Sequence, residues 1–377
     1  MTNRQSAYLD LLRVVAAFAV VFGHIALWRF SGERYNTMRG HAFASDAVIV
    51  FFVLSGFIMA FVTTQRNRGA ANFVMSRATR ILSVAVPALI LTALVDRWGY
   101  AIAPDFYARY IIPDPGVSVE EAVRALSFST HWWELRLPPG SNAPWWSLSY
   151  EVSYYVMFGL WVFARGWLRW GLLALAALVV GPNTLLLMPA FIIGVWLHGH
   201  LRGAAERPQD RGMSIALSAL PVGTYAMLHM GNVPKTLEAW TTQAVTAEMG
   251  WALQFSSNFV WAAVVAVLVA VHIRGMWRLL SEEGRGTASW VKPVKWLAGG
   301  TFSLYLVHFP LLHLIEVGLP TSGSARLDDV VMGVVAVLAC YLLAEAFERP
   351  LPRFRAALRK LIQTRKRPLR ERALEAG

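Results

Sequence analysis

Tyr8-Leu-Asp-Leu-Leu-Arg13-Val-Val-Ala-Ala-Phe-Ala-Val-Val-Phe-Gly-His24-Ile25 is apolar enough to cross a bilayer, yet it carries an arginine and a histidine eleven residues apart. Eleven helical steps rise about 16 Å and turn about 20° past three full turns, so both side chains share one face. Ionisable side chains inside a membrane helix are costly and mark functional sites. The pair therefore predicts a cavity lined by both side chains, in which Arg13 binds an anion and His24 takes part in proton transfer.

Composition places the whole chain in a membrane. Hydrophobic residues make up 56% of its 377 residues and charged residues only 15%, whereas soluble domains carry about 25% charged residues. The formal net charge of +12 comes mostly from short loops between apolar segments and from the tail. That distribution is typical of membrane topology, so we predict no nucleic-acid partner.

Apolar periodicity predicts an all-α, polytopic membrane protein with about ten spans. The inner segments of that arrangement hold 25 of the 35 Lys and Arg residues and the outer ones nine, so both termini are expected in the cytoplasm. Eight spans remain an alternative, because the fifth and sixth are separated only by Gly181-Pro182-Asn183. The predicted spans are 7–29, 45–64, 81–97, 146–164, 168–182, 184–201, 213–230, 255–273, 298–319 and 328–347.

The spans and their connections form one domain, residues 1–350, followed by a basic cytoplasmic tail, 351–377, expected to contact anionic headgroups. We expect the long outer segment, 98–145, to be ordered by turns. The first span lacks a cleavage pattern, so no signal peptide is expected. Because His198 and His200 point to different helix faces, we predict no metal site.

Two imidazoles are candidates for proton chemistry. The unperturbed pKa of histidine suits a general base at neutral pH, although a lone histidine on an apolar face is often a structural residue. His24 is the favoured candidate, because Arg13 shares its face. His308 lies in the ninth span, two residues before Pro310, which predicts a local kink and exposed carbonyls.

Cations at the entry to the third span are candidates for phosphate binding. Arg77 and Arg80 are three residues apart at an expected helix start. Planar guanidinium groups at that spacing fit a phosphate. Ordinary cytoplasmic-side positive residues give the same pattern, so both interpretations stay open.

Carboxylates and aromatic residues complete the candidate set. Glu151 falls one to two turns inside a span, where it needs a partner or a role. Trp146 and its aromatic neighbours suit either sugar stacking or an interfacial belt. Glu348 closes the last span, where helix capping or an ion pair is the structural alternative.

In order, these stretches resemble the acyltransferase 3 family of membrane acyltransferases. Arg13 and His24 match its first-helix signature, and Phe51-Phe52-Val-Leu-Ser55-Gly56-Phe57 is similar to its second-helix motif. The remaining matches are Arg77 with Arg80-Ile81, Trp146-Ser-Leu-x-x-Glu151-x-x-Tyr-Tyr, Ser303-Leu-Tyr305-Leu-Val-His308 and Glu348-Arg-Pro350. The chain departs from the family pattern just before the paired phenylalanines. Members of the family often have a polar residue there, whereas this chain has Ile49-Val50, and its nearest acidic residue, Asp46, lies further upstream.

The resemblance implies transfer of a short acyl group, most often acetyl, from acyl-CoA to a hydroxyl, commonly of a carbohydrate. Its catalytic candidates are His24, Glu151, His308 and Glu348. Its acyl-CoA-binding candidates are Arg13, Ser55, Arg77, Arg80, Trp146 and Tyr305. It implies a co-substrate rather than a bound cofactor, a bilayer and a carbohydrate as partners, and the bacterial cytoplasmic (inner) membrane as location.

Two chemical routes and one rival function remain open. His24 acts either as general base or as the group that accepts the acyl chain, with Glu151 or Glu348 orienting its ring. The rival is a transporter or flippase that uses Arg13 and His24 for an anion and a proton. Acceptor identity, acyl length and oligomeric state cannot be predicted from the sequence.

Overall fold

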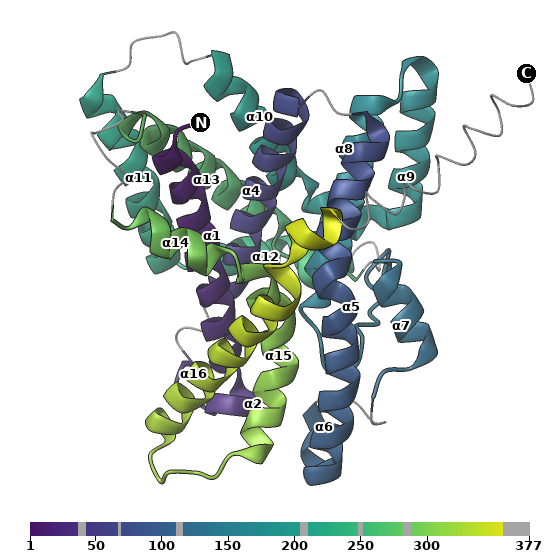
Figure 1. Ribbon diagram of the computed structural model, residues 1–377. Helices are drawn as coiled ribbons and strands as arrows, with labels where there is room; N and C mark the ends of the chain where they lie inside the picture. The colour runs from purple at the N-terminus through teal and green to yellow at the C-terminus, as the bar shows by residue number, and fades with distance from the viewer. Residues whose placement is uncertain are drawn as a thin grey trace, which may run out of the picture.

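The computed structural model describes residues 1–36, 43–66, 69–110, 116–203, 210–247, 252–281 and 289–356, which form helices and turns without a strand (Figure 1). The predicted all-α class is therefore confirmed. In chain order the helices are α1 (Asn3–Ile25), α2 (Trp28–Ser31), α4 (Phe43–Arg66), α5 (Ala70–Ile102), α6 (Pro104–Tyr110), α7 (Val119–Leu126), α8 (Trp145–Phe163), α9 (Gly166–Leu186), α10 (Met188–Gly203), α11 (Arg211–Met230), α12 (Val233–Thr242), η2 (Gln243–Ala247), η3 (Gln254–Ser256), α13 (Phe259–Leu279), α14 (Val291–Ala298), α15 (Thr301–Gly318), α16 (Ala325–Leu343) and η4 (Ala344–Glu348).

Eight helices within the described ranges are long and apolar enough to cross a membrane. They are α1, α4, α5, α9, α11, α13, α15 and the helix that begins with α16. Each of the ten predicted spans coincides with a helix, but α8 and α10 are not among these eight. Helix α10 has only 16 residues, and α8 is rich in serine and aromatic residues. Ten crossings and cytoplasmic termini thus stay predictions.

Helix α5 is longer than the predicted span 81–97. It runs for 33 residues from Ala70 to Ile102, because no glycine or proline interrupts residues 70–81. Arg77 and Arg80 consequently lie inside the helix, two to three turns after its start. At about 1.5 Å per residue, α5 is about 50 Å long, longer than the hydrocarbon core of a bilayer.

The predicted turn at Gly181-Pro182-Asn183 is a sharp break. Gly181 has a φ of 79° and a ψ of 170°, within residues 166–186 that are otherwise helical. A Cβ at Gly181 would stand 2.7 Å from the Trp133 ring, so both the backbone angle and the close approach require glycine. The next helix, α10, begins at Met188.

The outer segment 98–145 contains more helix than expected, namely the end of α5, α6 and α7. Helix α7 begins at a capping box, in which the Ser118 hydroxyl accepts from the Glu121 N–H and the Glu121 carboxylate accepts from the Ser118 N–H. At the other end of the chain, residues 351–356 are helical. The remainder of the predicted tail, 357–377, lies outside the described residues.

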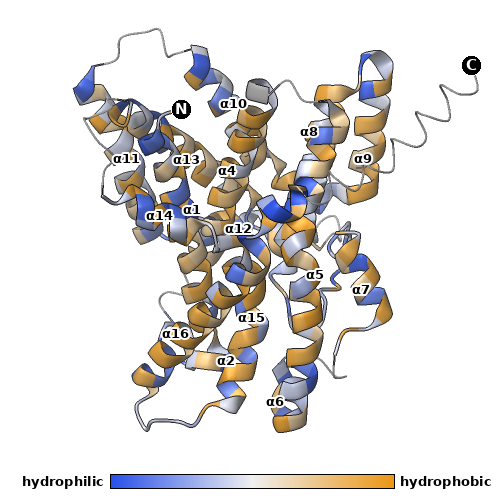
Figure 2. Cartoon of the chain, in the orientation of Figure 1, coloured by the Kyte–Doolittle hydropathy of each residue, from blue (hydrophilic) through white to orange (hydrophobic). Residues whose placement is uncertain are grey.

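Hydrophobic residues predominate along the long helices (Figure 2), and many large apolar side chains on them are exposed, Leu94 of α5 and Leu338 of α16 among them, as expected where lipid replaces water. Inside the molecule they form two clusters. One joins α4, α8, α10 and α13, and the other joins α5, α15 and α16, with α1 contributing to both. Helix α15 has the highest buried share of the candidate spans, 72%, so it lies at the centre of the bundle.

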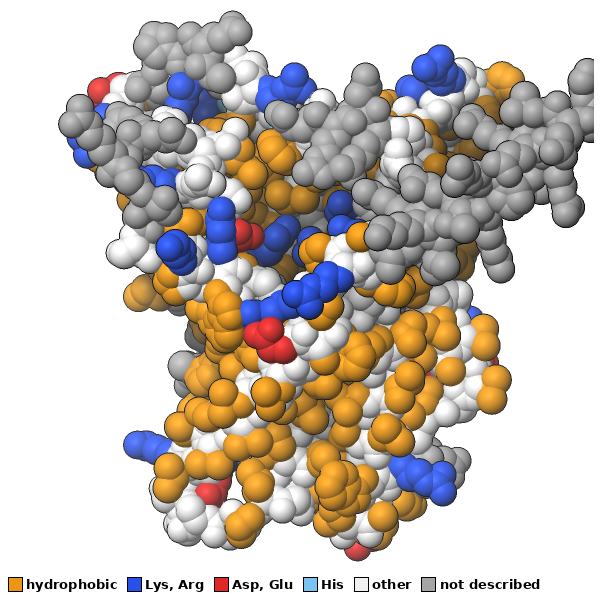
Figure 3. Space-filling model, viewed as in Figure 1, with side chains coloured by type: hydrophobic (Ala, Val, Ile, Leu, Met, Phe, Trp, Pro, Cys, Tyr) orange, Lys and Arg blue, Asp and Glu red, His pale blue; other side chains and the backbone are white. Residues whose placement is uncertain are grey.

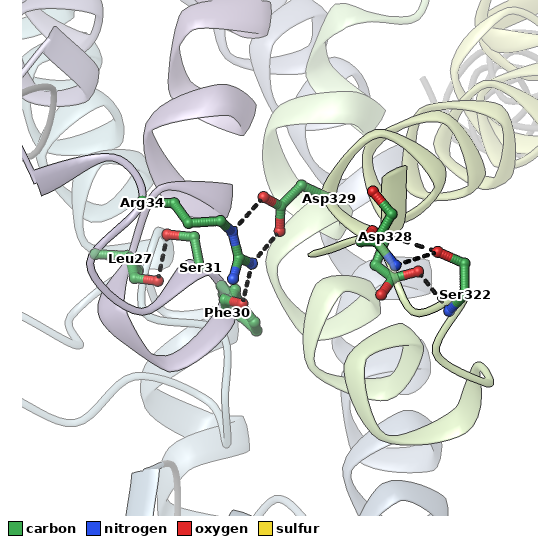
Figure 4. Close-up of polar contacts among 8 residues, drawn as sticks. Leu27, Phe30, Ser31, Arg34, Ser322, Asp328 and Asp329 are labelled. Carbon is green, nitrogen blue, oxygen red and sulfur yellow. Dashed lines mark hydrogen bonds and ion pairs between the residues drawn. The ribbon is translucent and has the colours of Figure 1, made fainter. Parts of the chain in front are cut away.

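A bidentate ion pair fastens the segment after α2 to the start of α16 (Figure 4). The Arg34 guanidinium donates to the two carboxylate oxygens of Asp329 at 2.6 and 2.9 Å, and it also donates to the Phe30 carbonyl. Paired guanidinium–carboxylate bonds fix geometry as well as distance. This contact holds the connection from α1 against the α15–α16 hairpin.

Helices α4 and α10 cross with almost no space between their backbones. A Cβ at Gly194 would come within 2.0 Å of the Val53 carbonyl oxygen, and one at Gly56 within 2.0 Å of the Phe191 carbonyl oxygen. We expect Gly194→Ala to separate the helices and to cost about 1–3 kcal/mol, the usual penalty of overpacking. Thermal unfolding in detergent measures this loss.

The matched control is Gly199→Ala on the same helix, where a Cβ meets nothing within 4 Å. Because alanine is the better helix former, this variant should unfold at the wild-type temperature or slightly above it. Equal unfolding temperatures for Gly194→Ala and Gly199→Ala would contradict the close crossing.

Candidate active site

A cavity between α1, α4, α5, α8 and α15 collects six of the ten predicted site residues. Lysine and arginine side chains gather beside a hollow in the middle of the face shown in Figure 3. The cavity is narrow, with a volume of about 90 Å³. The predicted residues that line it are Arg13, Ser55, Arg77, Arg80, Glu151 and Tyr305.

The three arginines of the cavity have few partners. Arg13 contacts Asp10 one turn earlier at 3.4 Å, and Arg77 donates to the Ser76 hydroxyl at 3.4 Å. Within the described ranges, the Arg80 guanidinium makes no ion pair or hydrogen bond. Guanidinium groups at an apolar cavity are stable only with a counter-charge or water. The cavity therefore offers cationic hydrogen-bond donors with few protein partners.

Glu151 is satisfied by hydroxyl groups. Its Oε1 accepts from the Ser55 hydroxyl and, at 2.5 Å, from the Tyr155 hydroxyl. This arrangement joins α4 to α8 and explains how a carboxylate is tolerated one to two turns inside an apolar helix. At the deep end of the cavity, the hydroxyls of Ser147 and Tyr305 join α8 to α15 at 2.5 Å.

His24 and His308 contact each other directly. His24 Nδ1 lies 2.7 Å from His308 Nε2, and the rings are nearly parallel with centroids 5.0 Å apart. His308 is completely buried, whereas His24 is partly exposed. His308 follows Tyr305 by almost one turn of α15, and Tyr305 lines the cavity. The imidazole pair thus lies about one turn beyond the arginine cavity.

Pro310 shapes the helix that carries His308. Proline cannot donate to the carbonyl four residues earlier, and the Leu306 carbonyl instead accepts from Asn142 Nδ2 at 2.9 Å. Helix α15 continues through Pro310 to Gly318. The carbonyl that Pro310 was predicted to leave without a donor in its own helix is thus present, and Asn142 in the segment before α8 donates to it.

Two predicted site residues lie apart from this cavity. Trp146 packs against Phe255 with parallel rings 4.7 Å apart, inside the apolar cluster of α4, α8 and α10. Glu348 accepts from the Ser303 N–H and hydroxyl, both at 2.8 Å, and so caps the N-terminus of α15. Neither side chain lines the cavity or hydrogen-bonds to His24.

The structure adds two charged or titratable residues near the imidazole pair that sequence reasoning missed. Arg29 donates to His313 Nε2 at 3.1 Å and to the Tyr110 carbonyl at 3.0 Å. Its guanidinium also lies over the ring of Phe309, the residue that contacts His24. His313 is completely buried. The signal that identified His24, an ionisable residue in an apolar span, was present for His313 too.

The surroundings of Asp46 and His131 indicate that both residues support the fold. Asp46 accepts from Tyr225 at 2.7 Å, Trp261 at 2.8 Å and His229 at 3.1 Å, which ties α4 to α11 and α13. In the segment before α8, burial lowers the pKa of His131 to about 3. That imidazole is therefore neutral at physiological pH.

The comparison with known families identifies the class of protein. A family model described as an acyltransferase domain matches residues 6–345, nearly the whole chain. Together with the membrane-spanning helices, this match defines an integral membrane acyltransferase. The chain belongs to the acyltransferase 3 family.

Curated relatives are similar over different lengths. An O-acetyl transferase of Shigella phage Sf6 is 29% identical over 41% of this chain and 46% of its own length. Nodulation protein 10 of Rhizobium leguminosarum bv. viciae is 26% identical over 46% of this chain and 48% of its own length. The chain thus spans about half the length of these two relatives.

The exopolysaccharide production protein ExoZ of Rhizobium meliloti is 25% identical over 83% of this chain and 92% of its own length. No solved structure matches this chain.

Glu348 is either a helix cap or a catalytic carboxylate, and the two interpretations make different predictions. We expect Glu348→Ala to cost about 1–2 kcal/mol in stability, because the N–H groups of Phe302 and Ser303 and the Ser303 hydroxyl lose the carboxylate that accepts from them. Glu348→Gln keeps an acceptor oxygen, so it should unfold near the wild-type temperature and retain enzyme activity. Thermal unfolding and turnover of the two variants measure this.

Glu345→Ala is the matched control, because Glu345 makes an exposed pair with Arg349 at 2.9 Å and should change stability by about 0–1 kcal/mol. A folded but inactive Glu348→Gln variant would show that this carboxylate takes part in proton transfer.

Proposed function

We propose that this protein transfers a short acyl group, acetyl in the simplest case, from acyl-CoA to a hydroxyl of a carbohydrate or glycosylated acceptor. The observation that carries this proposal is one continuous arrangement on α1 and α15. Arg13 lines a cavity of cationic donors, and about one turn beyond its inner end His24 contacts His308. The names of two relatives, an O-acetyl transferase of a Shigella phage and an exopolysaccharide production protein of Rhizobium meliloti, support an acetyl group and a polysaccharide.

The chemistry of the donor fits the cavity. Coenzyme A carries three phosphates at one end and a slender pantetheine arm that ends in the thioester. Arg77 and Arg80 offer forked, charge-assisted donors for phosphate. A typical ligand pocket measures about 300–1,000 Å³, so the cavity of about 90 Å³ is too small for the nucleotide, which we expect to stay at the entrance while the acyl end of the arm enters.

The sidedness of the donor follows from the positive charges. With cytoplasmic termini, 25 of the 35 Lys and Arg residues fall on the cytoplasmic side, as the positive-inside tendency requires. Acyl-CoA then enters from the cytoplasm at Arg77 and Arg80. A bacterial cytoplasmic membrane agrees with the source of the relatives, which are bacterial or from a bacteriophage.

Acyl transfer needs a base for the acceptor hydroxyl. In the direct route His24 takes the hydroxyl proton while the hydroxyl oxygen attacks the thioester carbon. The carbon–sulfur bond breaks, and the proton passes to the thiolate, which leaves as free CoA thiol. In the two-step route a nitrogen of His24 attacks the thioester carbon, the carbon–sulfur bond breaks and CoA leaves as the thiolate. The acceptor hydroxyl then attacks the acyl-imidazole, its proton passes to the thiolate to give free CoA thiol, and His24 is released.

A transporter is the alternative function, and release of CoA thiol distinguishes an acyltransferase from it. A carrier leaves acetyl-CoA intact, whereas an acyltransferase liberates one thiol for each acyl group transferred. Membership of an acyltransferase family and three arginines beside an imidazole pair favour the enzyme.

We expect wild-type protein in lipid to release thiol from acetyl-CoA when a glycan extract is present, and His24→Ala to release at least about 100-fold less. His200→Ala is the matched control, because that ring stacks on Trp196 in α10 and does not line the cavity. Equal thiol release by His24→Ala and wild type would overturn the role of His24.

A second experiment tests the arginines. Removing a charge-assisted bond costs about 1.5–3 kcal/mol, so Arg77→Gln should weaken CoA binding about tenfold to hundredfold. Thermal shift with CoA measures the affinity, at low and at high salt. Arg97→Gln, an exposed residue at the other end of α5, should bind CoA like wild type. An unchanged affinity in Arg77→Gln would place the phosphates elsewhere.

A further inference from the structure

A chain of two hydrogen bonds leads from the backbone of α15 to His24. His308 Nδ1 lies 2.8 Å from the Leu304 carbonyl oxygen, one turn earlier on the same helix. His308 Nε2 lies 2.7 Å from His24 Nδ1. Both nitrogens of His308 are therefore engaged. Within the described residues, the imidazole of His24 has no other hydrogen-bond partner than His308.

The carbonyl determines where the protons lie. A carbonyl oxygen only accepts hydrogen bonds, so His308 Nδ1 must carry a hydrogen. In a neutral ring the other nitrogen, Nε2, then has a lone pair and accepts. His24 Nδ1 is its only donor, and must carry the hydrogen of that bond. His24 Nε2 is left with an unshared electron pair.

Burial keeps His308 neutral. Its side chain is completely buried, and the rings of Tyr305 and Phe309 lie beside it. The nearest titratable and charged groups are His24 and Arg29 on neighbouring elements and His313 on α15 itself, and none supplies a negative charge. An imidazolium there would be an uncompensated buried cation, which is far more costly than a neutral ring.

We propose that His308 is a positioning residue that fixes the tautomer of His24, so that His24 Nε2 is the atom that takes the proton of the acceptor hydroxyl or attacks the thioester. This inference rests on the proposed acyl transfer. In the reaction His24 Nε2 gains a proton or an acyl group, and the positive charge that develops on the ring is stabilised by the bond from His24 Nδ1 to His308 Nε2. His308 itself neither gains nor loses a proton.

A positioning role of His308 can be distinguished from the role of a second catalytic base. A side chain that only accepts from His24 Nδ1 can be replaced by another neutral acceptor, whereas a proton carrier cannot. Glutamine places an amide oxygen near the position of the histidine Nε2, and leucine places none. The pair of variants His308→Gln and His308→Leu therefore distinguishes the two roles.

The first measurement is turnover of acetyl-CoA with the glycan extract, in lipid, across a range of pH. Without its acceptor His24 loses its fixed tautomer, so we expect His308→Leu to lower kcat by about 10²–10⁴-fold with an unchanged KM for acetyl-CoA. His308→Gln should recover kcat to within about tenfold of wild type, with the same single ionisation in its pH profile. The control His313→Leu removes another buried imidazole from α15 and should lower kcat far less than His308→Leu.

The second measurement does not depend on turnover. Nitrogen-15 chemical shifts of labelled histidine report which ring nitrogen carries hydrogen, and the His24 signals are those lost in His24→Ala. Wild type and His308→Gln should show hydrogen on Nδ1, and His308→Leu should show it mainly on Nε2. Hydrogen on Nε2 of wild-type His24 would overturn the proposal even if no acceptor is found.

The remaining outcomes are also decisive. A folded His308→Gln variant as inactive as His308→Leu would make His308 a proton carrier. Wild-type kcat in His308→Leu would remove any role for the pair. Absence of both turnover and CoA binding in wild type, with the expected nitrogen shifts, would reject acyl transfer while leaving the hydrogen-bond assignment intact.

Discussion

The hydrogen bond between His24 and His308 joins the first span to the most buried one and determines the geometry of the candidate site. Imidazole and guanidinium groups are costly inside a membrane unless protein groups or water satisfy them. Here two of the satisfying groups come from far along the chain, His308 for His24 and Ser55 for Glu151, and Tyr155 on the same helix completes the contacts of Glu151. The bundle is thereby built around polar contacts that only the correct assembly of α1, α4, α8 and α15 provides.

Helix α15, which carries His308, is held by three different contacts. The Glu348 carboxylate caps its first turn. The Tyr305 hydroxyl meets Ser147 at the deep end of the cavity, and Asn142 occupies the carbonyl that Pro310 leaves free. These contacts fix the height and the rotation of the helix. A rigid helix is the appropriate support for a ring whose hydrogen-bonding nitrogen must face a second ring within 2.7 Å.

The sequence was sufficient to predict the helical class and most residues of the cavity. It was not sufficient to predict which side chains contact one another across helices. The spacing of Arg13 and His24 placed both on one face because helix periodicity is local. Nothing local indicates that His308 contacts His24, or that Glu151 binds Ser55 rather than an imidazole, since those contacts depend on how helices pack. The start of α5 was misplaced for a related reason: hydropathy marks the apolar part of a helix, and α5 extends beyond it to Ala70.

The most direct measurement is to locate the acyl group itself. An acyl-CoA analogue with a short photoreactive acyl chain, irradiated with the protein in lipid, labels whichever residues surround the thioester, and peptide mass spectrometry identifies them. We expect CoA-competable labels on α1 around His24 and on α15 around His308. Labels confined to the entrance near Arg77 and Arg80, or to the lipid-facing helices, would contradict delivery of the acyl group to the imidazole pair.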